Sequence, residues 1–270
     1  MNLPYEGLKE ALEDNEEEVA ERFEYLHEKK HLQIEWIRQR VAKLADGPLH
    51  VLDVGGGRGD LAVDLASSLE KCSVTVVDVN ESSLEAGRAY AERLGVSSKT
   101  RFIYADFADY HRDPHAFQSG IPTSPPVNLV TALHACGDLS DLAVEHAKTL
   151  SCAFLVCPCC YTKRYITEKG FGFEPGWFCV ANDACKDLME ERCDKPQTGS
   201  IVLGRLAELN DDMDVGSRAR RIINSIRLSE SEYKNVDGGN SAYRLSYEEY
   251  ENASSSRNLV LVGMRQNRVT

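Results

Sequence analysis

The sequence predicts an α/β fold built on a doubly wound, mostly parallel sheet. Short apolar runs rich in β-branched residues alternate with segments of helical periodicity, and the links between them are short. Three of these runs also carry or end in an acidic residue. The predicted strands cover 49–54, 73–78, 101–106, 128–133 and 153–156. In such a sheet ligands bind outside the carboxyl ends of the strands, so the residues that follow each run are the first candidates for a site.

Helical segments precede the predicted sheet. Apolar positions at helical spacing over 8–26 and 34–44 predict two helices that pack on or over the sheet. We therefore expect an N-terminal helical extension or lid at 1–46 and one main domain at 47–270, within which 161–241 form insertions on the substrate side.

The most informative segment is the glycine-rich turn after the first strand. Asp53, Gly55, Gly57 and Gly59 follow the spacing acid-x-Gly-x-Gly-x-Gly, and a helical pattern begins directly afterwards. Glycine allows positive φ angles and lets the backbone approach a ligand closely. Asp60 stands where a dinucleotide fingerprint needs a small residue. The spacing instead resembles the first motif of class I methyltransferases, which bind S-adenosylmethionine.

Two further acids stand at the ends of the next strands. A carboxylate at Asp78 accepts hydrogen bonds from both hydroxyls of a ribose, so we expect it to hold that group. The resemblance to the methyltransferase pattern implies that Asp106 accepts from the adenine amino group. The neighbouring Val79 and Phe107 are included in the predicted cofactor site.

The end of the chain predicts a closing pair of strands. Residues 243–250 and 258–262 are expected to pair antiparallel, although the acidic pair at 248–249 is a weak strand former. With them the fold becomes a seven-stranded, Rossmann-like methyltransferase sheet. Four prolines within 110–127 predict a loop there.

Candidate catalytic groups follow the fourth and fifth strands. His134 is the predicted proton acceptor or orienting group, and it is also placed beside the cofactor, because imidazole titrates near neutrality. Cys159, Cys160 and Lys163 are expected to line the acceptor side. These residues share the carboxyl edge of the sheet with the glycine turn.

The cysteines at 157, 159 and 160 leave three interpretations open. Small, semi-apolar side chains can shape a tight turn, which we favour. A thiolate nucleophile, as in cytosine-C5 methyltransferases, needs a lowered pKa that His134 or Lys163 would supply. Zinc sites usually use C-x-x-C pairs, and the C-x-C-C spacing has no matching second pair, so we expect no metal.

Composition narrows the choice of partner. The net charge is -12, and residues 1–29 hold ten Asp/Glu against three Lys/Arg, a net -7. Any nucleic-acid contact therefore depends on a local patch, and the basic helix expected over 217–227 is the candidate. The odd count of nine cysteines predicts reduced thiols. Without an 18-residue apolar run or a signal peptide, we expect no membrane contact and a soluble protein of the cytoplasm or nucleus.

Two paired motifs identify a narrower resemblance. His134-Ala-Cys-Gly-Asp and Cys157-Pro-Cys-Cys-Tyr-Thr-Lys163 resemble the H-x-C-G and C-C motifs of a methyltransferase group that includes acceptor-stem tRNA 2′-O-methyltransferases. The Lys30-His-Leu-Gln33 segment resembles the one that precedes the glycine loop in those proteins. The resemblance implies S-adenosylmethionine as cofactor and an RNA ribose hydroxyl, that of tRNA in the group it resembles, as acceptor.

The sequence also departs from the tRNA enzymes. It has no N-terminal zinc module of cysteines and histidines, since its first cysteine is Cys72, and it is acidic. A small-molecule or protein acceptor therefore remains an alternative, and so does a non-catalytic module that binds the cofactor and docks a basic partner. The oligomeric state is left open.

Overall fold

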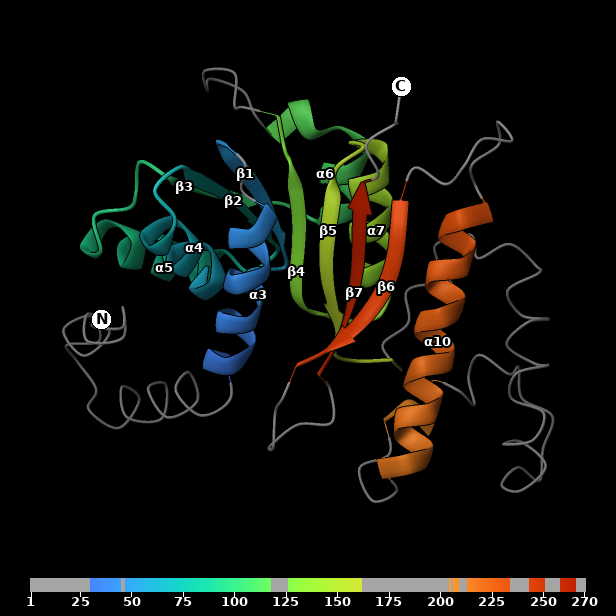
Figure 1. The fold of residues 1–270 in the computed structure, drawn as a ribbon. Helices are drawn as coiled ribbons and strands as arrows, with labels where there is room; N and C mark the ends of the chain where they lie inside the picture. Colours follow the sequence, from blue (N-terminus) through green and yellow to red (C-terminus); the bar gives the residue numbers. More distant parts are fainter. Residues whose placement is uncertain are drawn as a thin grey trace.

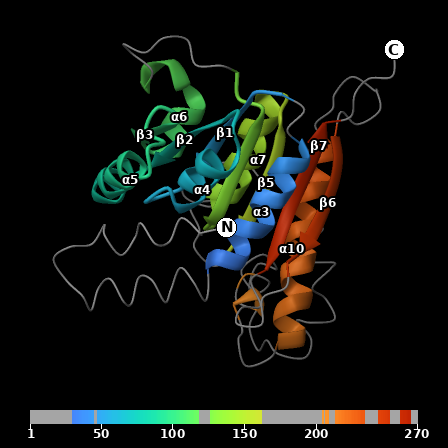
Figure 2. The same ribbon diagram turned by 60° about the vertical axis from the view of Figure 1, so that its left-hand side comes forward.

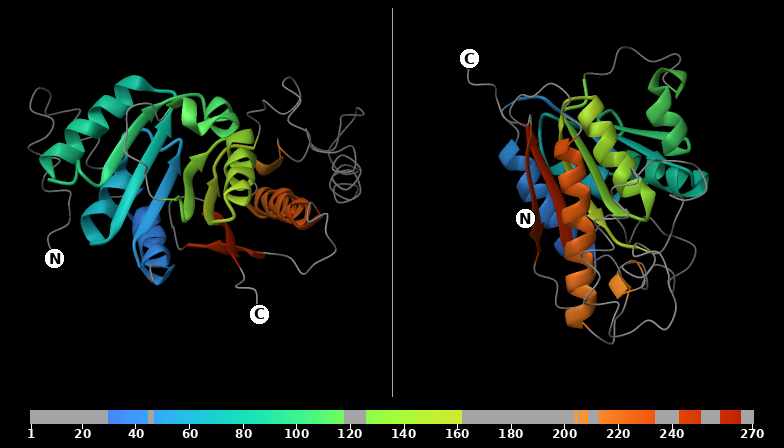
Figure 3. Two further views of the ribbon diagram at one scale, coloured as in Figure 1. Left: turned by 90° about the horizontal axis from the view of Figure 1, so that it is seen from above. Right: turned by 90° about the vertical axis from the view of Figure 1, so that its right-hand side faces the viewer.

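The protein is represented by a computed structural model that describes residues 30–44, 47–117, 126–161, 204, 206–208, 213–233, 243–250 and 258–265. One seven-stranded sheet runs through this part of the chain, with helices packed against both of its faces (Figures 1 and 3). The predicted α/β class and the seven-stranded methyltransferase sheet are confirmed.

The strand order is β3-β2-β1-β4-β5-β7-β6. The bounds are β1 (Leu49–Val54), β2 (Cys72–Asp78), β3 (Thr100–Tyr104), β4 (Leu129–Ala135), β5 (Ala153–Pro158), β6 (Tyr243–Glu249) and β7 (Leu259–Arg265). The first five pair in parallel, and β7 inserts antiparallel between β5 and β6. The acidic pair at 248–249 is within β6, where both residues are paired with β7.

The helices largely follow the predicted periodicity. Their bounds are α3 (His31–Leu44), α4 (Asp60–Ser68), α5 (Glu81–Arg93), α6 (Phe107–Arg112), α7 (Asp138–Thr149) and α10 (Met213–Tyr233), with a 3-10 turn η2 (Pro114–Phe117). The loop predicted from 110 onward was partly wrong, because α6 and η2 occupy 107–117. Asp106 accepts a hydrogen bond from the Ala108 backbone, which caps α6, and Tyr110 is buried in the core.

Alternating side chains of the strands build two cores, one on each face. One face packs against α3, α4 and α5, where Ile34, Leu61 and Leu84 are almost fully buried. The other packs against α6, α7 and the end of α10. Each fully buried aliphatic side chain of this kind stabilises the fold by about 1.5–3 kcal/mol.

Helix α3 lies across the central strands (Figure 2). Ile34, Ile37 and Val41 are buried against β1, β4, β5 and β7, so this helix is part of the core. The predicted helix at 8–26 lies outside the described residues, and the boundary at 46/47 stays a prediction. None of the described helices is long and apolar enough to cross a membrane.

Candidate functional site

The glycine turn stands at the carboxyl end of β1. Gly55, Gly57 and Gly59 have φ angles of 67°, 56° and 70°, a region that other residues avoid. A Cβ at Gly55 would come within 2.9 Å of the Leu139 side chain, and one at Gly59 within 2.6 Å of Phe102. The positive φ angles and these close contacts together strain any larger residue at the two positions.

Asp78 closes the turn from the neighbouring strand. Its Oδ2 accepts a hydrogen bond from the Gly57 amide at 2.9 Å, and its Oδ1 accepts from the Asn80 amide at 2.8 Å. The next side chain, Val79, is 62% exposed. The half-buried Asp78 carboxylate and the exposed Val79 side chain thus flank the glycine turn. They stand where the ribose and the adenine of the cofactor are expected to bind.

Asp106 and Phe107 occupy the end of β3 in different ways. Asp106 is exposed, and its Oδ1 caps α6 through the Ala108 amide at 2.8 Å. The Phe107 ring is buried against Tyr110 and His146, with ring centroids 5.8 and 5.4 Å away. The Phe107 side chain therefore belongs to the core. At this position only the backbone could contact an adenine in the predicted site.

Asp53 supports the turn from below. Its side chain is fully buried and its Oδ1 accepts a hydrogen bond from the Thr131 hydroxyl at 2.9 Å. Its Oδ2 has no hydrogen-bond partner among the described residues. Burial raises the pKa of Asp53 to about 7. The carboxyl group therefore links β1 to β4 through Thr131 and packs against Gly56, where a Cβ would come within 2.4 Å of Oδ2.

His134 occupies an irregular position at the end of β4. The register between β4 and β5 shifts at this residue, and His134 itself has a φ of 70°. Such a conformation costs a non-glycine residue about 1–3 kcal/mol and persists where the surroundings impose it. Its Nε2 is buried and has no hydrogen-bond partner among the residues that the structure describes.

A charged pair stands beside this histidine. The Lys30 ammonium donates to Asp60 Oδ2 at 2.7 Å, and both groups act electrostatically on His134. Burial, aided by the positive charge of Lys30, lowers the pKa of His134 to about 4. The sequence singles out Lys30 only within the Lys30–Gln33 motif and Asp60 only as a departure from the dinucleotide fingerprint, and it does not predict their pairing. Their pairing joins the start of α3 to the start of α4.

We expect His134 to stay neutral in the folded protein throughout the physiological range. The pKa of His134 in the unfolded chain is near 6.5. Between about pH 6.5 and 4 the unfolded state therefore binds one more proton than the folded state, and the free energy of unfolding decreases as the pH is lowered. NMR of the imidazole nitrogens should show no titration above about pH 5. A midpoint near 6.5 would contradict this.

A His134→Gln variant assigns the NMR signal and isolates the stability effect. It should lose less unfolding free energy than the wild type between pH 6.5 and 5. Asp53 works in the opposite direction, because its raised pKa makes the folded state bind a proton as pH falls through 7. Since Asp53 is present in both proteins, the difference between them reports His134.

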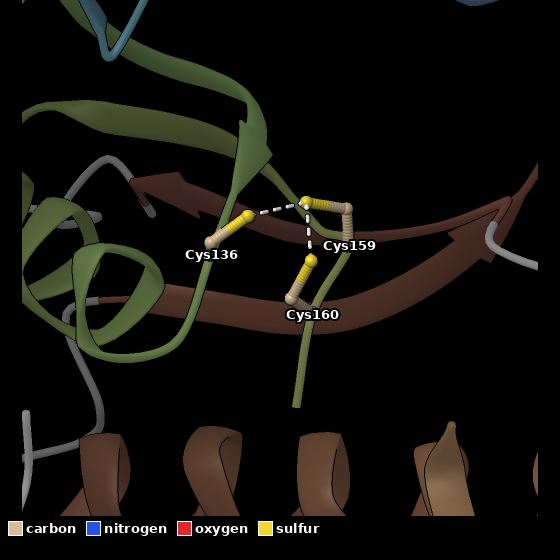
Figure 4. Close-up of side chains that lie close together, drawn as sticks. All are labelled: Cys136, Cys159 and Cys160. Carbon is tan, nitrogen blue, oxygen red and sulfur yellow. Dashed lines mark hydrogen bonds between the residues drawn. The ribbon is translucent and has the colours of Figure 1, made fainter. Parts of the chain in front are cut away.

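Three cysteines from two strand ends meet beside this site (Figure 4). The Sγ atoms of Cys136 and Cys159 are 2.9 Å apart, and those of Cys159 and Cys160 are 3.6 Å apart. Burial and the neighbouring thiols raise the pKa values of Cys159 and Cys160. This disfavours a thiolate nucleophile, which needs a lowered pKa. Lys163 lies outside the described residues.

The basic helix directs much of its charge inward. Arg227 in α10 donates to Asp141 at 2.9 Å and to Asn224 at 3.1 Å, and Arg220 donates to the Ala207 carbonyl at 2.8 Å. Both arginines are buried. Arg220 and Arg227, two of the four arginines in the predicted phosphate-binding helix, thus make hydrogen bonds inside the protein and stabilise the fold.

Comparisons with known proteins agree with this geometry. A family model described as a methyltransferase domain matches residues 26–165, which is more than half of the chain. The chain belongs to this methyltransferase-domain family. This family membership agrees with the predicted methyltransferase class.

Solved structures show the same fold. The O-methyltransferase from Bacillus cereus in complex with SAH has a TM-score of 0.54 at 12% identity, over 96% of this chain and 91% of that one. The SAH-bound methyltransferase PaMTH1 of Podospora anserina has a TM-score of 0.51 at 10% identity, over 99% of this chain and 89% of that one.

Curated relatives match a shorter region. The human glutathione S-transferase C-terminal domain-containing protein is 32% identical over 119 residues, which are 44% of this chain and 17% of that protein. The release factor glutamine methyltransferase of Rhodopirellula baltica is 36% identical over 100 residues, 37% of this chain and 33% of that protein. The chain therefore covers a third or less of these relatives.

Proposed function

We propose that this methyltransferase transfers the methyl group to a hydroxyl that is held by His134. The observation that carries the proposal is the buried Nε2 of His134, which has no partner among the described residues although it stands at the carboxyl edge of the sheet. A neutral imidazole nitrogen accepts a hydrogen bond from O–H. A protonated one would repel a sulfonium, so the lowered pKa of His134 suits the site.

The chain offers a fitting place for S-adenosylmethionine. Gly55 and Gly59 leave no space for a Cβ, and the Asp78 carboxylate faces the same turn. When bound, the cofactor supplies a methyl group on a positively charged sulfur. Asp78 would accept hydrogen bonds from the ribose hydroxyls, and Asp106 would accept one from the adenine amino group.

His134 manages the single proton of the reaction. The cofactor would supply the methyl group by in-line displacement from its sulfur, and the proton that the acceptor hydroxyl loses would pass to His134 Nε2. With a pKa near 4, the imidazole first orients the hydroxyl through a hydrogen bond. It takes the proton as the new C–O bond makes the oxygen acidic, and then returns the proton to water.

The acceptor class we propose is an RNA ribose hydroxyl, in the cytoplasm or nucleus. Its support is the resemblance of the two motifs at 134–138 and 157–163 to those of tRNA 2′-O-methyltransferases. The structure brings the described parts of both motifs together at adjacent strand ends, where the Gly137 amide donates to the Cys160 carbonyl at 2.9 Å. Within α10, Arg218 and Arg221 are the exposed arginines that could reach phosphate, although Arg221 pairs with Glu249 in this structure.

A small-molecule or protein acceptor is the second candidate. The observation that favours it is the inward direction of Arg220 and Arg227, together with a net charge of -12. Without a broad basic face, binding to a polyanion depends on few contacts.

Methyl-labelled cofactor distinguishes these acceptors. The full chain is incubated with RNA, protein and metabolite fractions of a cell extract, and label is counted in each. Label in RNA that is resistant to alkali at the modified position supports the ribose proposal, and label in either other fraction supports the second candidate. No label in any fraction, despite tight cofactor binding, would indicate a non-catalytic module.

A His134→Gln variant tests the role of the histidine in the same assay. We expect turnover to fall by roughly 10²–10⁴-fold with little change in cofactor affinity, because only proton transfer and orientation are lost. Unchanged turnover would remove His134 from the reaction.

A further inference from the structure

The cluster of Cys136, Cys159 and Cys160 has features that the methyl-transfer proposal does not use. Its three sulfur atoms lie within 4.8 Å of one another, although they come from two different strand ends. The six described cysteines form no disulfide. Figure 4 shows the three sulfurs pointing toward a common point between the end of β4 and the end of β5.

The backbone holds these sulfurs in position. The Gly137 amide donates to the Cys160 carbonyl at 2.9 Å, and the Cys159 amide donates to the Ala135 carbonyl at 3.4 Å. The two segments that carry the cysteines are therefore tied together on both sides of the cluster. Three soft donors on a fixed frame are the arrangement that thiophilic metal ions bind, whereas Mg²⁺ and Ca²⁺ prefer oxygen.

We propose that Cys136, Cys159 and Cys160 form a three-thiolate binding site for Zn²⁺. On binding, each S–H bond is replaced by a Zn–S bond, three protons are released, and the ion with its three thiolates carries a net charge of -1. Arg227 donates to the Gly137 carbonyl at 3.4 Å, next to Cys136, so a positive charge stands close by.

The geometry needs only a small adjustment. Zn–S bonds of about 2.3 Å in a tetrahedral arrangement place the sulfurs about 3.8 Å apart. Cys159 and Cys160 are already at 3.6 Å, and the Cys136 and Cys159 sulfurs, at 2.9 Å, separate by about 0.9 Å.

The fourth coordination position is left to water or to an incoming group. Among the described residues no other histidine, cysteine, aspartate or glutamate completes the cluster. Three protein ligands with one open position are typical of catalytic zinc, whereas structural sites use four. The cluster follows the ends of β4 and β5, where the acceptor is expected, so an acceptor group would have a place on the ion.

Zinc binding by the full chain tests the proposal without any measurement of methyl transfer. The reduced protein is stripped of metal and titrated with Zn²⁺ against a competing chelator, and Co²⁺ is used in parallel as a spectroscopic probe. We expect one equivalent of Zn²⁺ at this site and a thiolate-to-cobalt charge-transfer band. The zinc affinity should decrease as the pH is lowered, because protons compete for the sulfurs.

Single serine variants at 136, 159 and 160 should each bind roughly 100-fold more weakly or worse, since losing a group that only orients a ligand already costs roughly 10–100-fold. Cys72→Ser is the matched control, because Cys72 is buried at the opposite end of the sheet, at the start of β2. It should bind zinc as the wild type does.

Alkylation of the wild-type protein keeps the test decisive if a variant fails to fold. Mass spectrometry should show that zinc protects Cys136, Cys159 and Cys160 from modification while leaving Cys72 and Cys152 unaffected. The proposal is overturned if the reduced chain binds no zinc, if zinc protects other cysteines instead, or if 136 and 159 oxidise to a disulfide that zinc does not prevent.

Discussion

Replacing Asp78 with alanine should weaken S-adenosylmethionine binding by about 1–3 kcal/mol, which is roughly 5–150-fold in the dissociation constant. The carboxylate holds the Gly57 and Asn80 amides at 2.9 and 2.8 Å and would accept from the ribose hydroxyls. Its loss leaves two backbone donors and both hydroxyls to be satisfied by water. Isothermal titration calorimetry with the cofactor and with S-adenosylhomocysteine measures the change.

Two further variants define what Asp78 contributes. Asp78→Asn keeps a carbonyl oxygen for one amide and should lose less affinity than Asp78→Ala. Asp109→Ala is the control, since the Asp109 carboxylate is exposed on α6 and pairs with the exposed Arg112. Affinity that is equal in Asp78→Ala and Asp109→Ala would exclude Asp78 from the cofactor site.

Replacing Arg227 with alanine should lower the free energy of unfolding by about 2–4 kcal/mol. The guanidinium is 7% exposed and donates to Asp141 at 2.9 Å, so its removal leaves a carboxylate in a mostly dry environment without its charge partner. It also donates to the Gly137 carbonyl, which ties α10 to the segment after β4. Urea denaturation followed by circular dichroism measures the loss.

Arg221→Ala provides a matched control on the same helix. Arg221 pairs with Glu249 at 2.6 Å, but both side chains are more than one-third exposed, so the change should cost less than about 1 kcal/mol. Equal losses in the two variants would mean that the Arg227–Asp141 pair is no more than a surface ion pair.

The order of elements could be predicted because each depends on local pattern. Apolar runs and helical periodicity placed the strands and most helices, and the glycine spacing placed the turn at 55–59. Asp78 and Asp106 could be located because an acid at the end of a parallel strand faces the same edge as its neighbours. The predicted roles of these residues stay predictions.

The contacts that sequence reasoning missed all depend on register or helical phase. The order of elements places Cys136 at the same sheet edge as Cys159 and Cys160, but the direct contact of the sulfurs depends on the β4–β5 register, which shifts between Leu133 and Ala135. The expectation of no metal rested on looking for a second C-x-x-C pair along the chain, not across two strands.

Helical phase explains the second difference. The sequence predicts a basic patch on the helix that became α10. In the structure Arg220 and Arg227, which are seven positions apart, lie on the buried side of this helix. Two turns of helix bring positions separated by seven back to the same face. The partner of Arg227, Asp141, is 86 positions away, and its contact is set by the packing of α10 beside α7.

A crystal structure of the chain with S-adenosylhomocysteine tests the central claim most directly. The account predicts that the ribose hydroxyls contact Asp78, the adenine lies beside Val79 and Asp106, and the sulfur faces His134 across the glycine turn. A ligand bound anywhere else, or a carboxyl edge that stays empty at saturating ligand, would contradict it.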